Sequence, residues 1–177
     1  GVTELVTPGV AFNDDILQSK SNNFLAAIHF GSKTLGVSFL DVSTGEFLVS
    51  EGPAEYVDKL LQNFNPSEVL FSKQKRKLFA ETFGNNYHVF HLEDWIFQSD
   101  YAFETLTKHF AVKNLKGFGV DHLEEGIIAA GAALHYLSET RHTKLQHISK
   151  LARIAEDEYV WMDRFTIRNL ELYHSNQ

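Results

Sequence analysis

The chain has 177 residues, of which 44% are hydrophobic and 22% charged, a composition typical of a globular protein with room for one domain and the edge of a second. The absence of cysteine excludes disulfides, thiolate zinc sites and thiol nucleophiles. The formal net charge of −7 argues against a domain that grips nucleic acid mainly through its phosphates.

The first part of the chain predicts a connecting arm followed by a three-stranded antiparallel meander. The arm covers residues 2–23, where a Thr-Pro-Gly motif precedes a polar stretch. Residues 24–30 are nearly all apolar, as expected of a strand covered on both faces. A second strand alternates over 35–39, and a third includes 47–49. Gly45, in the turn between these two strands, suits a backbone with positive φ.

Helices and strands alternate after the meander. The predicted elements are a helix from Pro53 to about Asn65, a strand at 68–71, a helix at 73–83, a strand at 87–90, a helix at 99–112 and a long helix after Asp121. Asp121 is expected to cap the long helix together with Glu124. The helix at 99–112 is expected to point Ala102, Phe103, Leu106 and Phe110 inward. This order predicts an α/β protein with a ribonuclease-H-like mixed sheet and a C-terminal helical extension.

The end of the chain looks like a second, incomplete unit. A polar and basic stretch over 141–153 is expected to form a domain boundary, and a strand at 158–162 leads into a final helix. That helix carries apolar residues that no later element covers, and a helix of about 12 residues is marginal alone. Because the chain also begins at Gly1, with its sole methionine at position 162, we expect it to be an internal part of a larger protein. No apolar run has the length of a membrane span.

A catalytic ribonuclease-H-like domain needs clustered carboxylates to hold magnesium ions, one of them in the first strand. The strand at 24–30 has no acid. Asp41 and Glu46 flank a turn and Glu68 begins a strand, and ordinary polar roles explain all three better than a metal site. We therefore predict no catalytic residue.

No metal or cofactor site is predicted either. The chain has 9 histidines, but His88 and His91 would face opposite sides of a strand, and no H-E-x-x-H arrangement occurs. The basic run at 73–77 is interpreted as a solvated helix face, and the Gly-Phe-Gly segment at 117–119 as a turn rather than a phosphate loop.

One exposed helix face remains as a candidate binding surface. On the helix at 99–112, Glu104, Thr105 and Lys108 are expected to face solvent, opposite its apolar side. Simple solvation explains such a face most often, and a partner surface is the functional alternative.

Short segments resemble the bacterial MutS family of DNA mismatch repair proteins. Each is a weak mark alone, but they occur in the family's order and cover almost the whole chain. The marks are the Thr-Pro-Gly arm at 5–9, the first strand at 23–28, the hairpin at 40–47, the Gly-Phe-Gly loop at 117–120 and the run at 162–171.

This resemblance implies a division of the chain into three parts. Residues 1–19 would be a linker arm from an absent mismatch-binding domain, 20–145 the connector domain, and 146–177 the truncated beginning of the core, or lever, domain. The connector of this family is ribonuclease-H-like without nuclease activity, links the mismatch-binding and ATPase regions, and offers a surface to a MutL-type partner. Glu104, Thr105 and Lys108 are assigned to that surface from helix geometry, not from a matched motif.

The resemblance also implies properties of the larger protein. We expect this chain to be no enzyme and to bind no cofactor itself, with ATP and magnesium used elsewhere in the parent. The expected partners are the parent's other domains, a MutL-type protein, mismatched DNA bound through other domains, and a second copy in a homodimer. The expected location is the bacterial cytoplasm, associated with the nucleoid and without a membrane. Two alternatives remain open: a metal-dependent ribonuclease-H-like nuclease and a stand-alone protein–protein adaptor.

Overall fold

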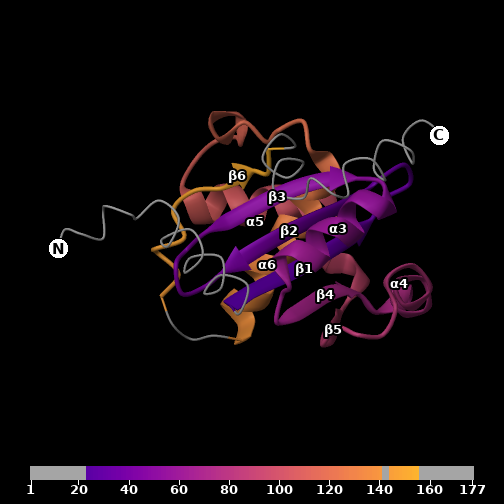
Figure 1. Cartoon of the computed structure of the whole chain (residues 1–177). Helices are drawn as coiled ribbons and strands as arrows, with labels where there is room; N and C mark the ends of the chain where they lie inside the picture. The colour runs from indigo at the N-terminus through magenta and orange to yellow at the C-terminus, as the bar shows by residue number, and fades with distance from the viewer. Residues whose placement is uncertain (1–22, 141–143, 156–177) are drawn as a thin grey trace.

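The computed structural model describes residues 23–140 and 144–155, and these form a six-stranded mixed sheet with helices on both faces (Figure 1). The strand order across the sheet is β5-β4-β1-β2-β3-β6. The strands are β1 (Phe24–Phe30), β2 (Leu35–Asp41), β3 (Phe47–Gly52), β4 (Glu68–Ser72), β5 (Val89–Leu92) and β6 (Ala152–Arg153).

Strands β1, β2 and β3 form the predicted antiparallel meander. Asp41 organises the turn between β2 and β3. Its Oδ1 accepts two hydrogen bonds from Ser43, one from the backbone N–H at 2.9 Å and one from the side-chain hydroxyl at 2.6 Å. The N–H of Thr44 also points to this oxygen, at 3.3 Å. Gly45 closes the turn with a φ of 83°, which confirms the prediction of a positive φ at this glycine.

Strands β4 and β5 continue the sheet beyond β1, each parallel to its inner neighbour. The order β3-β2-β1-β4-β5, with a meander followed by two parallel strands, is the ribonuclease-H-like arrangement predicted from the sequence. The fifth strand runs from Val89 to Leu92, two residues later than expected, and Tyr87, just before it, packs its ring edge-on against Phe79.

Two hydrophobic cores lie on opposite faces of the sheet, since alternate residues of each strand point to opposite sides. In β1, Phe24, Ala26 and Ile28 face one core, whereas Leu25 and Ala27 face the other. The helices on the first face are α3 (Ala54–Phe64) and α4 (Arg76–Phe83), and those on the second are α5 (Ser99–Phe110) and α6 (Glu124–Thr140). Figure 1 shows α3 and α6 on either side of the central strands.

Several helix limits differ from the predicted ones for local reasons. Pro53 is the residue before α3 rather than its first residue, and Asn65 ends the helix with a φ of 46°. The helix predicted at 73–83 is split, because the Ser72 hydroxyl accepts from the N–H of Gln74 and holds residues 73–75 in a separate 3₁₀ turn. Helix α5 ends at Phe110, since Ala111 is left-handed with a φ of 58°.

The prediction that Phe103 points inward is wrong. Its side chain is 43% exposed, whereas Ala102 and Leu106 are buried and Phe110 is half-buried against Phe47 and Phe118. The buried residues of α5 are Ala102 and Leu106, which lie one helical turn apart. Phe103, next to Ala102 along the chain, lies outside this buried face.

Helix α6 is buried along most of its length, between the sheet and α5. The predicted cap by Asp121 is wrong, because the helix begins three residues later, at Glu124. Its first N–H groups are bound instead by the Glu51 carboxylate of β3, whose Oε1 accepts from Glu125 N at 2.9 Å and from Gly126 N at 3.2 Å.

Residues 144–155, in the stretch expected to form a domain boundary, pack onto the same sheet. Ile148, Leu151 and Ile154 are buried, and β6 pairs in parallel with β3. The folded unit thus extends past residue 145. The predicted strand at 158–162 and the final helix lie outside the described residues.

Within the described residues, no helix is long and apolar enough to cross a bilayer.

Candidate partner-binding site

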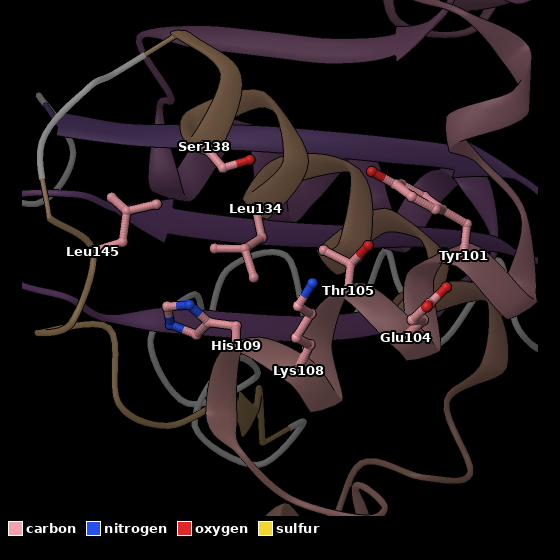
Figure 2. Close-up of a pocket in the computed structure, with 8 residues that line it drawn as sticks. All are labelled: Tyr101, Glu104, Thr105, Lys108, His109, Leu134, Ser138 and Leu145. Carbon is pink, nitrogen blue, oxygen red and sulfur yellow. The ribbon is translucent and has the colours of Figure 1, made fainter.

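An open groove of about 430 Å³ lies between α5, the C-terminal half of α6 and the segment after it (Figure 2). Its lining residues are Tyr101, Glu104, Thr105, Lys108 and His109 of α5, Leu134 and Ser138 of α6, and Leu145. Leu134 forms the apolar floor, since it is 2% exposed. The groove therefore combines an apolar base with polar and charged walls, which is the usual make-up of a protein-binding depression.

The structure brings the three predicted surface residues together on one wall of this groove. Glu104 and Lys108 are exposed and Thr105 is half-buried. Figure 2 shows the Lys108 amine reaching up beside Thr105, while the Glu104 carboxylate points to the other side, next to Tyr101. The wall formed by α5 thus carries one acidic and one basic side chain, Glu104 and Lys108. That a partner binds to this wall stays a prediction.

The two helices meet closely enough to fix the shape of the groove. A Cβ added at Gly131 would lie 2.5 Å from the Cβ of Ala102, so the small residue lets α5 approach α6. Next to this contact, the Tyr101 hydroxyl and His135 Nδ1 are 2.6 Å apart. Burial lowers the pKa of His135, although Glu139 opposes the effect, so the neutral imidazole is favoured at neutral pH.

The third wall is held by histidines that bind backbone oxygens. His109 Nε2 lies 2.7 Å from the carbonyl oxygen of Ile148, and His147 Nε2 contacts the carbonyl oxygen of Val42. These contacts tie the segment around Leu145 to α5 and to the end of β2. The role of these histidines is thus structural.

An aromatic patch beside the groove was missed by sequence reasoning. Trp95 is 54% exposed and contacts the rings of Tyr101 and His135 edge-on, at centroid distances of 5.1 and 5.6 Å. Phe90, 44% exposed, forms a separate contact with Tyr136, at a centroid distance of 5.2 Å. Trp95 lies in a short turn between predicted elements, where no periodic pattern assigns a side chain to a face, so only its size and apolar character could have drawn attention to it.

Two of the carboxylates weighed as nuclease ligands, Asp41 and Glu68, serve other contacts. Asp41 is fully buried in its turn, which confirms its interpretation as a turn residue. Glu68 is half-buried rather than a solvated strand end, and it accepts a hydrogen bond from the Tyr136 hydroxyl at 3.0 Å. Across residues 23–140 and 144–155, no three His, Asp or Glu side chains are placed to hold a metal ion.

A titratable cluster lies at the opposite end of α6, where the helix begins. His29 of β1 is 3.1 Å from Glu125, and its ring stacks on Phe97. Burial and the nearby Lys75 lower the pKa of His29, against the opposing effect of Asp94. Burial also raises the pKa of Glu125, and the neighbouring Glu51 and Glu124 raise it further.

The attraction between a histidinium and a carboxylate would shift both pKa values the other way. The pKa of His29 is lowered nonetheless, because burial disfavours the charged form of an imidazole that lies half-buried between the sheet and α6. We therefore interpret the contact of His29 and Glu125 as a hydrogen bond from a neutral imidazole N–H to the carboxylate. The cluster joins β1, β3 and α6, which makes it a structural junction.

The fold and the groove together define a ribonuclease-H-like domain that presents a polar groove and an aromatic patch on its α5–α6 face. The family described as MutS domain II matches residues 23–149, which is most of the chain. The chain therefore belongs to the MutS family and contains its domain II.

Proteins named DNA mismatch repair protein MutS are similar to almost the whole chain. The protein from Christiangramia forsetii is 71% identical over 175 residues, and that from Flavobacterium psychrophilum is 69% identical over 175 residues; each alignment covers 99% of this chain and 20% of the relative. The protein from Cytophaga hutchinsonii is 58% identical over 177 residues, 100% of this chain and 21% of its own length. The chain thus spans about a fifth of the length of these curated relatives.

Among solved structures, the large terminase nuclease of a thermophilic phage aligns with 64% of this chain and 81% of its own, at 15% identity and a TM-score of 0.43.

Proposed function

We propose that this chain is a non-catalytic connector segment of a DNA mismatch repair protein, which links the mismatch-binding and ATPase regions and offers a surface to a MutL-type partner. The observation that carries the proposal is the 71% identity to a MutS protein over 99% of the chain. Residues 1–19 would come from the linker arm and residues from 20 onward from the connector. Because residues 146–155 pack onto the connector's own sheet, the start of the lever domain would fall after them, within 156–177.

The proposed mechanism is transmission of a change in position rather than chemistry. ATP and magnesium would be bound by other parts of the parent, a homodimer in the bacterial cytoplasm associated with the nucleoid. Occupancy of the ATP site would shift the connector between two positions, and this shift would reach both the DNA clamp and the MutL-type partner. The groove between α5 and α6 supports this role, since it is a shaped surface on two helices that pack closely together.

The isolated chain is expected to have no ATPase activity and no preference for mismatched DNA. The test measures ATP hydrolysis, and the affinity of the chain for a heteroduplex and for the matched homoduplex. Submicromolar binding that prefers the heteroduplex would contradict the proposal.

The assigned surface has its own test, in the full-length parent. The double variant Glu104→Lys, Lys108→Glu reverses both charges on the groove wall while keeping the net charge. We expect it to weaken binding of the MutL-type protein about threefold to tenfold, because charged groups at a docking surface set orientation and encounter rate. Glu81→Lys on α4, on the other face of the sheet, is the control. Equal binding by the original, the double variant and the control would remove Glu104 and Lys108 from the surface.

The nuclease alternative has less support. It needs an acid in β1, which has none, and its best remaining carboxylate, Asp41, already accepts hydrogen bonds from Ser43 and Thr44. Magnesium-dependent cleavage that is lost in Asp41→Asn, with the fold intact, would restore this alternative.

A further inference from the structure

The aromatic patch formed by Trp95, Tyr101 and His135 contains a side chain that is largely open to solvent, since Trp95 is 54% exposed. Tryptophan and tyrosine are enriched at protein interfaces relative to the rest of the surface. The patch borders the groove through Tyr101, which belongs to both.

The exposed ring of Trp95 is held in place by its neighbours. Its centroid lies 5.1 Å from that of Tyr101 and 5.6 Å from that of His135, and these two rings also contact each other at 5.6 Å. The hydrogen bond between Tyr101 and His135 locks the two supporting rings. A partner that covers Trp95 would therefore gain contact area without first ordering the side chain.

Acidic side chains border this patch on α5 and α6. Asp100 and Glu104 flank Tyr101 in α5, and Glu139 follows His135 by one turn of α6. All three are exposed, and none forms an ion pair with another described residue. Because His135 is neutral at physiological pH, it adds no positive charge to the patch.

We propose that the aromatic patch binds an arginine-bearing segment of a partner protein, with the guanidinium stacked on Trp95 and its charge directed to Asp100, Glu104 and Glu139. A flat guanidinium is weakly hydrated and stacks well on an indole face, while the surrounding acids favour a cation over an acidic or wholly apolar segment. Tryptophan, tyrosine and arginine are also the residues that contribute most at protein interfaces.

This inference specifies the chemistry of the proposed partner surface and rests on the proposed function. Its test does not depend on which protein the partner is. The probe is a fluorescein-labelled peptide of alternating glycine and arginine, titrated with the 177-residue chain and followed by anisotropy. The matched peptide replaces arginine with citrulline, which keeps the shape and removes the charge. We expect the arginine peptide to bind more tightly than the citrulline peptide, with an affinity that falls as salt is added.

Variants locate the binding on the patch. Trp95→Ala should weaken the arginine peptide about two- to tenfold, and Trp95→Phe, which keeps a ring, should weaken it less. Glu104→Gln combined with Glu139→Gln should weaken it as well. Leu78→Ala and Glu81→Gln, which change exposed residues of α4 on the other face of the sheet, are the matched controls and should bind like the original chain.

Equal binding of the arginine and citrulline peptides, or unchanged affinity in both Trp95 variants, would overturn the proposal. Circular dichroism of each variant shows whether the fold is kept. The chain could bind the peptide in a Trp95-dependent way while the full-length parent fails to bind a MutL-type protein. That result would support the patch and contradict the proposed partner. Normal binding of the MutL-type protein by the Trp95→Ala parent would show that the patch is not part of the MutL-binding surface, and would keep the proposed function.

Discussion

At the scale of single residues, burial lowers the pKa of His29 despite the carboxylate beside it. His29 lies against Glu125 at 3.1 Å, an arrangement that would raise the histidine pKa on the surface of a protein. Its position at the junction of β1 and α6 lowers the pKa instead. The protein therefore prefers the neutral imidazole, and this preference links the stability of the fold to pH.

The change His29→Gln should make stability less sensitive to mild acid. A group whose pKa is lowered by folding contributes stability that is fully present above its unfolded value of 6.5 and is lost as pH falls through the folded value. The original chain should thus lose stability as the pH falls through 6.5 and on toward the lower folded value, and the variant should lose less.

Urea unfolding at several pH values in this range measures the effect. His91 and His135 contribute in the same direction, so the slope should shrink rather than vanish. Glu125, whose pKa is raised, acts in the opposite direction at the acidic end. Parallel stability curves for the two proteins would contradict the assignment.

At the scale of elements, helix α6 depends on a cap that comes from another part of the chain. The Glu51 carboxylate lies 74 residues before the first N–H that it binds, and it satisfies donors that the helix cannot satisfy itself. The same carboxylate raises the pKa of Glu125 after the larger effect of burial. Sheet and helix are therefore joined at the helix start by hydrogen bonds as well as by packing.

Glu51→Ala should lower the free energy of unfolding by about 1–2 kcal/mol, because it leaves two helix N–H groups without their acceptor. Glu51→Gln keeps an oxygen and should cost less. In both variants the pKa of Glu125 should fall, which NMR titration of the carboxyl carbon measures. Glu81→Ala, an exposed acid of α4, is the control and should change stability by less than about 0.5 kcal/mol. A Glu51→Ala protein as stable as the control would show that the cap is dispensable.

Elements that depend on local sequence could be predicted, and those that depend on distant contacts could not. The meander and α3 follow from alternation and from a single apolar face that includes Val57 and Leu60. The cap of α6 was assigned to Asp121 because a capping residue is normally adjacent, whereas Glu51 reaches the helix only through the tertiary fold. Phe103 and Trp95 were misjudged or missed because exposure depends on how neighbouring elements pack.

At the scale of the whole molecule, residues 144–155 complete the sheet rather than begin a separate body. Ile148 and Leu151 belong to the core between the sheet and α6, and Ile154 belongs to the opposite core. The N–H of Ile154 donates to the carbonyl of Val49 at 3.0 Å. The basic composition of this stretch hid its apolar residues, which occur every third position and fit neither a clear helix nor a strand.

Leu151→Ala should destabilise the entire sheet domain, by about 2–5 kcal/mol, because the side chain is 2% exposed and its loss leaves a cavity. Thermal and urea unfolding should each remain a single transition, shifted to lower temperature and lower urea. Leu78→Ala, at a position that is 41% exposed, should change stability by less than about 0.5 kcal/mol. A separate early transition in Leu151→Ala would mean that this segment unfolds independently.

The glycine contacts of α6 have a mechanical consequence. A Cβ added at Gly36 of β2 would lie 1.9 Å from the backbone oxygen of Glu125, and one added at Gly131 would lie 2.6 Å from the Cα of Ala102 in α5. Where main chains touch, no layer of side chains can change rotamer to absorb a displacement. Helix α6 is thus in close contact with β2 on one side and with α5 on the other. A displacement of α5 is therefore expected to displace α6 and, through it, β2 in the centre of the sheet.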